Sequence, residues 1–190
     1  MNAAVRFIQG DATSLADKIK EKVDAVIYCN SIHYVLDKEK LLHEIKQSLR
    51  PGGTLSFNTS FFDGSHPPES QEFYRRWMMR SLRILKREYG LRPVRSDKVT
   101  SRKHLSADEY SDLLVSQGFE VTNADLMEVD VPLQGWVDIS GYSDFIEGVM
   151  PGVPMDKASS SLQQGASEIY NEKDLKSVKR HWLGIVATSL

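Results

Sequence analysis

Continuous apolar runs alternate with segments whose apolar residues recur at helical spacing along the first part of the chain. Val23–Cys29 is apolar almost throughout and rich in β-branched residues, which predicts a strand covered on both faces, as in a parallel sheet. Asp37 is a candidate N-cap for a helix whose apolar side chains recur at helical spacing: Leu41, Leu42, Ile45 and Leu49. Pro51–Gly53 ends this helix, and Thr54–Thr59 is the next expected strand. A strand, a helix and a strand with short connections predict a crossover unit of a parallel α/β sheet.

Two shorter patterns precede Val23. Val5–Gln9 is an apolar-rich run closed by Gly10-Asp11, which predicts a buried strand that ends in a loop. Thr13 or Ser14 can cap a short helix that continues to about Lys22.

Helical spacing dominates after Phe61. Glu69–Tyr89 is predicted to form a long helix with an apolar stripe on one side and a stripe of arginines on another. Ser106 and Glu109 fit a capping box that opens a helix to about Gln117. The remaining expected elements are extended segments at 119–121 and 126–131, a short helix at 142–149, two helical pieces within 157–180 and a final strand at 182–187.

Composition narrows the class of protein. The 190 residues are 41% hydrophobic and 26% charged, as in a globular domain with a sizeable core. The formal net charge of -2 gives no electrostatic reason to expect nucleic acid or an acidic membrane as partner. The single cysteine, Cys29, excludes an intramolecular disulfide and makes an all-cysteine metal site implausible, so we expect no metal. No apolar run reaches the ~20 residues that span a bilayer, and no secretory signal is evident, so a cytoplasmic location is expected.

Three segments carry a resemblance to a known family. Phe7–Ala12, Asp24–Val35 and Leu49–Leu55 resemble the class I S-adenosylmethionine-dependent methyltransferases, of the small-molecule type 11/12. The helix that ends in Gln117-Gly118-Phe119 and the terminal strand at 182–187 are also typical of that family. The resemblance implies a Rossmann-like α/β sheet with a helical insert after its fifth strand, and S-adenosyl-L-methionine as cofactor.

The resemblance also implies that part of the sheet is missing. The family's strand order resembles 3-2-1-4-5-7-6, in which Val5–Gln9 would be the third strand and Val23–Cys29 the fourth. Only nine residues precede Gly10, so the family's glycine-rich loop and the acidic residue of its second strand have no candidates. We therefore expect a truncated chain whose sheet lacks the first two strands. Val5–Gln9 then either pairs directly with Val23–Cys29 or detaches.

The candidate cofactor site follows from the strand ends, because open α/β sheets bind ligands beyond the carboxyl ends of their strands. Asp11 can accept a hydrogen bond from the adenine amino group, and the backbone of Ala12 can donate to an adenine ring nitrogen. Three further candidates follow the next strand: Cys29, Asn30 and Ser31. For Asn30 and Ser31 the alternative is a loop pair that hydrogen-bonds its own backbone, and for Thr13 and Ser14 it is a helix cap.

His33 is the only candidate catalytic residue, as a general base, and packing or substrate contact is the alternative interpretation of this residue.

Within one domain spanning residues 1–190, we expect a helical insert or lid at 65–102 and a second variable lid region at 134–180. Five side chains can line a cavity for an apolar or aromatic acceptor: Tyr74, Trp77, Met78, Trp136 and Tyr142. The alternative is that this stripe only packs onto the sheet. The arginine face of the same helix can contact an anionic substrate or a membrane surface, or it is simply solvated.

Two functions of different classes follow. The first is methyl transfer from S-adenosyl-L-methionine to a small-molecule acceptor, in which the protein mainly aligns donor and acceptor. His33 would matter as a base only if the acceptor is a poor nucleophile. The second is a non-catalytic interaction module, a Rossmann remnant that binds a partner chain or a second copy through its exposed sheet edge.

Overall fold

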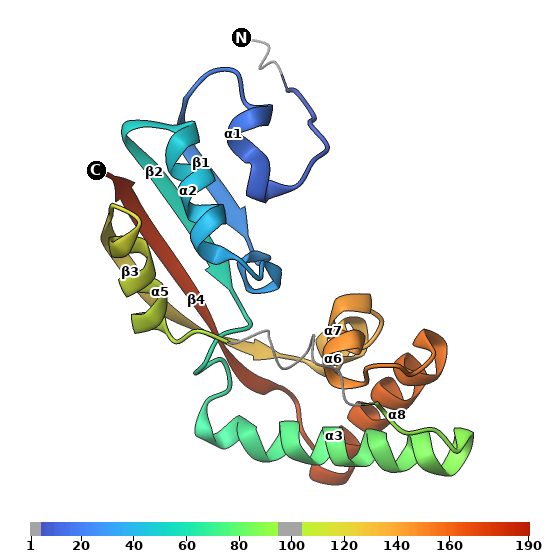
Figure 1. Cartoon of the computed structure of the whole chain (residues 1–190). Helices are drawn as coiled ribbons and strands as arrows, with labels where there is room; N and C mark the ends of the chain where they lie inside the picture. The colour runs from blue at the N-terminus through green and yellow to red at the C-terminus, as the bar shows by residue number, and fades with distance from the viewer. Residues whose placement is uncertain (1–4, 95–103) are drawn as a thin grey trace. The chain divides into compact units, whose positions relative to one another are not determined.

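The computed structural model describes residues 5–94 and 104–190, and the helices and strands are labelled in Figure 1. Residues 95–102 of the expected insert lie outside these ranges. The elements up to the end of the second strand are η1 Ala12–Ser14, α1 Leu15–Lys18, β1 Val23–Cys29, η2 Ile32–Tyr34, α2 Lys38–Ser48 and β2 Leu49–Thr59. Those that follow are α3 Pro68–Tyr89, α5 Ala107–Ser116, β3 Phe119–Val131, α6 Leu133–Ile139, α7 Ser143–Val149, α8 Met155–Lys173 and β4 Val178–Ser189.

The four strands form one sheet in the order β1-β2-β4-β3. β1 pairs with β2 in parallel, with Val26 beside Leu55, and β2 pairs with β4 in the antiparallel sense, with Phe57 beside Ile185. This order reproduces the 4-5-7-6 half of the expected sheet, and the connection from β1 through α2 to β2 is the predicted crossover. The expected fold class is therefore confirmed.

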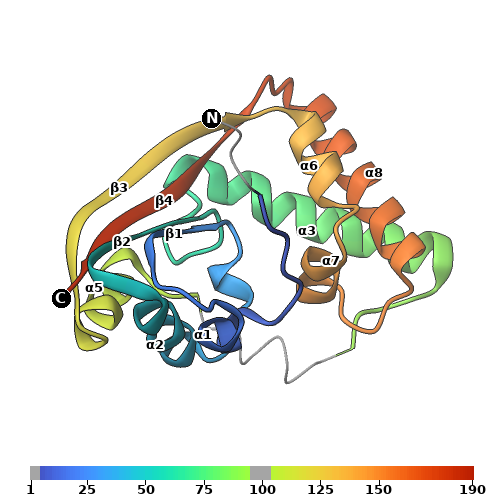
Figure 2. The same cartoon turned by 90° about the horizontal axis from the view of Figure 1, so that it is seen from above.

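The chain forms two compact units. Unit 1 comprises Met1–Asp63, His104–Met127 and Trp182–Leu190, and unit 2 comprises Gly64–Lys103 and Glu128–His181. β3 and β4 run from one unit into the other, as the two views of the chain show (Figure 2). Among the described residues, no helix is long and apolar enough to cross a membrane.

One face of the sheet in unit 1 is covered by α2 and α5. Side chains from both helices and from β2 and β4 form a single buried cluster, which includes Leu41, Leu42, Ile45, Leu55, Phe57, Tyr110, Leu114, Leu183 and Ile185. The predicted caps hold these helices in place. Asp37 accepts a hydrogen bond from the Lys40 backbone at 2.9 Å, and Ser106 with Glu109 makes both bonds of a capping box.

The other face of β1 is open, so the expectation of a strand covered on both faces is wrong for this face. The side chain of Ile27 is 73% exposed, and β1 is an edge strand of the described sheet. Val5–Gln9 is not a strand, and Phe7 is 93% exposed. A strand forms where a neighbouring strand satisfies its backbone, and no strand within residues 5–94 and 104–190 pairs with this segment. The described sheet thus lacks three strands of the family order rather than two.

Unit 2 is built on α3 and α8. Ion pairs and hydrogen bonds join the start of α3 to the end of α8 and the end of α3 to the start of α8, so the helices run antiparallel. An aromatic cluster packs beside them: Phe73, Trp77, Trp136, Phe145 and Tyr170. The predicted helix at 69–89 is confirmed as α3. The two helical pieces expected within 157–180 are instead the single helix α8, which ends where Asp174 adopts a left-handed conformation, before β4 begins at Val178.

The two helices lie close together at Gly165. A Cβ atom added there would lie 2.3 Å from Ser81 Oγ and 3.1 Å from the Ser81 backbone nitrogen. Ser81 is buried, and its hydroxyl donates to the Trp77 carbonyl oxygen at 2.8 Å. Neither helix can accommodate a methyl group at this crossing without moving.

Gly165→Ala is therefore expected to lower the free energy of unfolding by about 1–3 kcal/mol, because overpacking exceeds the gain in helix propensity. Gly148→Ala is the matched control, since Gly148 lies in helix α7 and no atom lies within 4 Å of an added Cβ. Urea unfolding of both variants measures the difference. A Gly165→Ala protein as stable as Gly148→Ala would show that the crossing is loose.

Candidate functional site

The carboxyl ends of β1 and β2 form the candidate site of unit 1. Because the two strands are parallel, β1 ends at Cys29 and β2 ends at Thr59 on the same edge of the sheet (Figure 1). Cys29 lies beside Asn58 in the register. Ligands of open α/β sheets bind at this edge, so the residues after each strand define the site.

Asn30 joins the two strand ends. It has a positive φ of 44°, in the left-handed region that asparagine tolerates better than most residues. Its backbone nitrogen donates to the carbonyl oxygen and to Oδ1 of Asn58, at 3.0 and 2.8 Å. Its own Oδ1 accepts from the backbone nitrogen and hydroxyl of Ser60, at 2.9 and 3.0 Å. The side chain therefore bonds the neighbouring strand end rather than its own backbone.

His33 is held by the same strand end. It lies in η2, is only 7% exposed, and its Nδ1 lies 2.8 Å from Thr59 Oγ1. The Thr59 hydroxyl donates to the Phe61 carbonyl oxygen and accepts from the Phe61 backbone nitrogen. The same hydroxyl also bonds His33 Nδ1, and which of the two groups donates depends on the imidazole tautomer. The ring also packs against Tyr34 and Phe61, with centroid distances of 4.1 and 4.7 Å.

Asp11 caps the first helical turn. Its Oδ1 accepts from the backbone nitrogen and hydroxyl of Thr13, at 2.8 and 2.9 Å. These bonds, with a smaller contribution from Lys40, hold the pKa of Asp11 below its usual value. The cap is thus Asp11 rather than Thr13 or Ser14, and Ser14 makes no capping bond with its side chain. Lys40 lies in the first turn of α2, so Asp11 lies at the end of α2 that faces the carboxyl ends of the strands.

Ala12 occupies the first position of η1, where a backbone N–H has no partner within the helix. Cys29 is exposed and Ser31 is half-buried at the turn between β1 and η2. The structure therefore brings Cys29, Asn30, Ser31 and His33 together at one strand end. Their roles in cofactor binding and catalysis, and those of Asp11 and Ala12, stay predictions.

The five candidate substrate residues all belong to unit 2. Trp77 and Trp136 lie in the aromatic core, and Trp77 Nε1 donates to the Leu162 carbonyl oxygen at 2.8 Å. Both therefore pack within unit 2 rather than onto the sheet, and their role in lining a substrate cavity stays a prediction. Tyr74 is half-buried, and burial raises its pKa. Met78 is half-buried and Tyr142 is 46% exposed, so these two and Tyr74 keep surface for a ligand.

The sequence interpretation missed three residues of the site. Asn58, Thr59 and Ser60 follow the apolar part of β2 and supply the partners of Asn30 and His33. The signal was present in the sequence, because a polar run at the end of a parallel strand lies at the ligand-binding edge. Residues at the carboxyl end of β2 are candidate ligand contacts for the same reason as those at the carboxyl end of β1.

Comparisons with known proteins give one family match and several similar folds. Residues 1–57 match the family model described as a methyltransferase domain. A candidate methyltransferase from Bacillus halodurans C-125 has a similar fold, with a TM-score of 0.51 and 15% identity over 95% of this chain. The [4+2]-cyclase SpnF is similar with a TM-score of 0.48 and 18% identity over 96% of this chain. A SAM-dependent methyltransferase from Methanosarcina mazei is similar with a TM-score of 0.46 and 15% identity over 95% of this chain. No curated protein matches the chain in sequence.

The fold and the matched segment point the same way. The described chain has a Rossmann-like sheet with polar residues at the carboxyl ends of its parallel strands, and this fold is like that of the class I methyltransferases. The chain spans 69% of the length of the B. halodurans protein, 56% of SpnF and 65% of the M. mazei protein.

Asn30→Ala is expected to lower the free energy of unfolding by about 1–3 kcal/mol, because Ser60 is buried and loses the acceptor of two hydrogen bonds. Asn30→Asp keeps an acceptor oxygen and tolerance of positive φ, so its loss should stay below about 1 kcal/mol. Denaturant unfolding compares the two variants. Equal stability of Asn30→Ala and the unmodified chain would mean that Asn30 does not join the strand ends.

Proposed function

We propose that this chain takes part in S-adenosylmethionine-dependent methyl transfer to a small-molecule acceptor. One observation carries the proposal. The segment that matches the methyltransferase domain model, residues 1–57, is also the segment that contributes Asp11, Ala12 and the β1 strand end to the candidate site. The order of the four strands supports the same assignment.

The proposed adenine contacts are Asp11 and Ala12. Both hydrogen bonds from Thr13 go to Oδ1 of Asp11, which leaves Oδ2 to accept from an adenine amino group. The depressed pKa keeps the carboxylate ionised, and hence an acceptor, at neutral pH. The N–H of Ala12 is in the first turn of η1 and can donate to a ring nitrogen. Cys29, Asn30 and Ser31 would contact the cofactor from the β1 end.

When bound, S-adenosylmethionine supplies an electrophilic methyl group, so the chain mainly has to position the acceptor in line with it. His33 is the proposed general base for acceptors that are poor nucleophiles. The lid roles of 65–102 and 134–180, and the acceptor contacts of Tyr74, Met78 and Tyr142, belong to this proposal.

The sequence contains no counterpart of the family's glycine-rich loop before Gly10. The contacts that this loop makes with the methionine end of the cofactor are therefore not available from these residues. We expect the chain by itself to hold the adenine end only, and hence to bind weakly.

A second function, an interaction module, has one observation in its favour. β1 is an edge strand of the described sheet, and its exposed side chains include Ile27 and Cys29. Unpaired edge strands bind other strands through their backbone groups. The occupant of this edge would be a partner chain or a second copy.

Titration with S-adenosylhomocysteine, followed by amide NMR of the whole chain, tests the proposed function. Methyl transfer predicts saturable shifts at residues 11–14 and 29–33. Ala12→Pro should weaken the affinity about tenfold, because it removes one donor at a first-turn position where proline fits the helix. The extended backbone of Asp11, with φ -81° and ψ 132°, suits a following proline.

Ala12→Gly is the control, because it keeps the donor and should keep the affinity. Absence of ligand-induced shifts at these residues would contradict the cofactor site and leave the interaction module as the function. Equal affinities of the proline and glycine variants would remove Ala12 from the site.

A further inference from the structure

A hollow of about 150 Å³ lies on the surface of unit 2, along α3. It is lined by Arg75, Arg76, Met79, Arg80 and Arg83 of α3 and by Ile169 of α8. The four arginines fall within about two and a half helical turns, so long side chains at these spacings can reach one point. The site does not depend on the methyltransferase proposal, because none of its residues belongs to unit 1.

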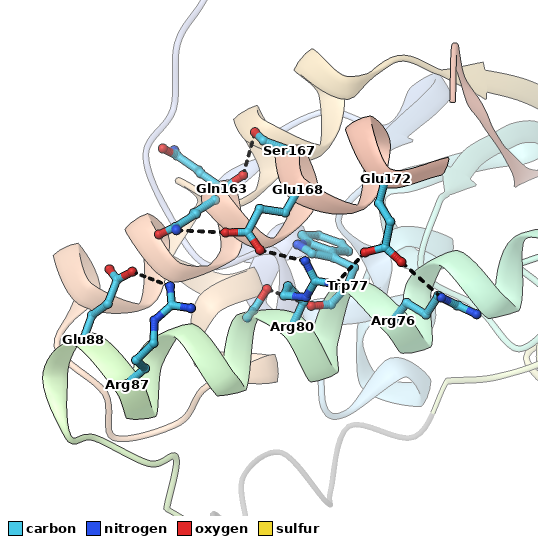
Figure 3. A network of polar contacts seen from close by, with 11 residues as sticks. Arg76, Trp77, Arg80, Arg87, Glu88, Gln163, Ser167, Glu168 and Glu172 are labelled. Atoms are coloured by element: carbon cyan, nitrogen blue, oxygen red, sulfur yellow. Dashed lines mark hydrogen bonds and ion pairs between the residues drawn. The ribbon is translucent and has the colours of Figure 1, made fainter. Parts of the chain in front are cut away.

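Two of the arginines are held in place by carboxylates, as Figure 3 shows. Arg80 contacts Glu168 and Glu172 of α8 at 2.7 and 2.6 Å, and its side chain is 28% exposed. Arg76 contacts Glu72 at 2.7 Å and Glu172 at 3.5 Å. The shared Glu172 orients both guanidinium groups beside the hollow. Fixing a long side chain in advance reduces the entropy that a ligand must remove.

The other two arginines, Arg75 and Arg83, are exposed and make no ion pair with any residue in the described ranges. Four guanidinium groups thus line the hollow. Three carboxylates contact two of them, Arg76 and Arg80, and no carboxylate of the described residues contacts the other two. Each guanidinium carries five N–H donors, and Arg80 directs one from each of two nitrogens to carboxylates. Donors and positive charge both remain for an anion.

We propose that this hollow binds a phosphoryl group, carried either by a soluble phosphate ester or by a lipid headgroup. Guanidinium groups match the spacing of phosphate oxygens and bind them in a bidentate manner. A hollow of this size holds several waters and therefore admits one phosphoryl group. Met79 and Ile169 supply the apolar part of the lining, beside which the organic portion of an ester can lie.

The variant Arg75→Ala/Arg83→Ala tests the site in the whole chain. It removes the two arginines without ion pairs, so no carboxylate loses its partner and the fold should be unchanged by circular dichroism. The matched control is Lys86→Ala/Arg92→Ala, which removes the same charge from two exposed positions at and just beyond the end of the same helix, outside the hollow and without an ion pair among the described residues. Inorganic phosphate, measured by calorimetry, is the soluble probe. Vesicles of phosphatidylcholine with and without phosphatidic acid are the membrane probe.

Saturable binding of phosphate, weakened at least about tenfold by the Arg75/Arg83 pair and kept by the control, supports a soluble phosphate ester. Binding only to vesicles that contain phosphatidic acid, with the same dependence on the two pairs, supports a lipid-borne phosphoryl group. Absence of binding to either probe overturns the proposal. An equal loss of binding affinity in both double variants also overturns the proposal, because it indicates diffuse electrostatic attraction to the helix rather than a specific site.

Discussion

Parallel pairing between β1 and β2 is the interaction on which the candidate site depends. It places the ends of two strands, separated by the whole of α2 in the sequence, at one edge of the sheet. Asn30 then joins these ends through Asn58 and Ser60, and His33 bonds Thr59. Without the pairing, none of these polar groups would have its partner. The buried cluster under α2 and α5 stabilises the pairing from one face only.

The open side of β1 is the structural consequence of an incomplete sheet. Parallel strands are stable when both faces are covered, and here Ala25, Ile27 and Cys29 remain exposed. A ligand or a chain that covers β1 would stabilise the same pair of strands that forms the site.

Local patterns in the sequence predicted the elements whose stability is local. The cap at Asp37, the capping box at Ser106 and the apolar spacing of α3 depend on residues within a few positions, and each was predicted close to its observed place. The prediction of a buried strand at Val5–Gln9 is wrong, because a strand needs a neighbour that local pattern does not reveal, whereas the alternative that this segment detaches from β1 agrees with the structure. The contact of His33 with Thr59 spans 26 residues, so only the fold could show it. The close approach of Gly165 to Ser81 is likewise set by helix packing.

Amide hydrogen exchange of the monomeric chain measures the central claim most directly. β1 is predicted to show alternating protection from Ala25 to Cys29, since amides bonded to β2 are protected and those on the outer edge are not. Residues 5–9 should exchange without protection. Uniform protection along β1, or strong protection at residues 5–9, would contradict the account, because another strand would then pair with this edge.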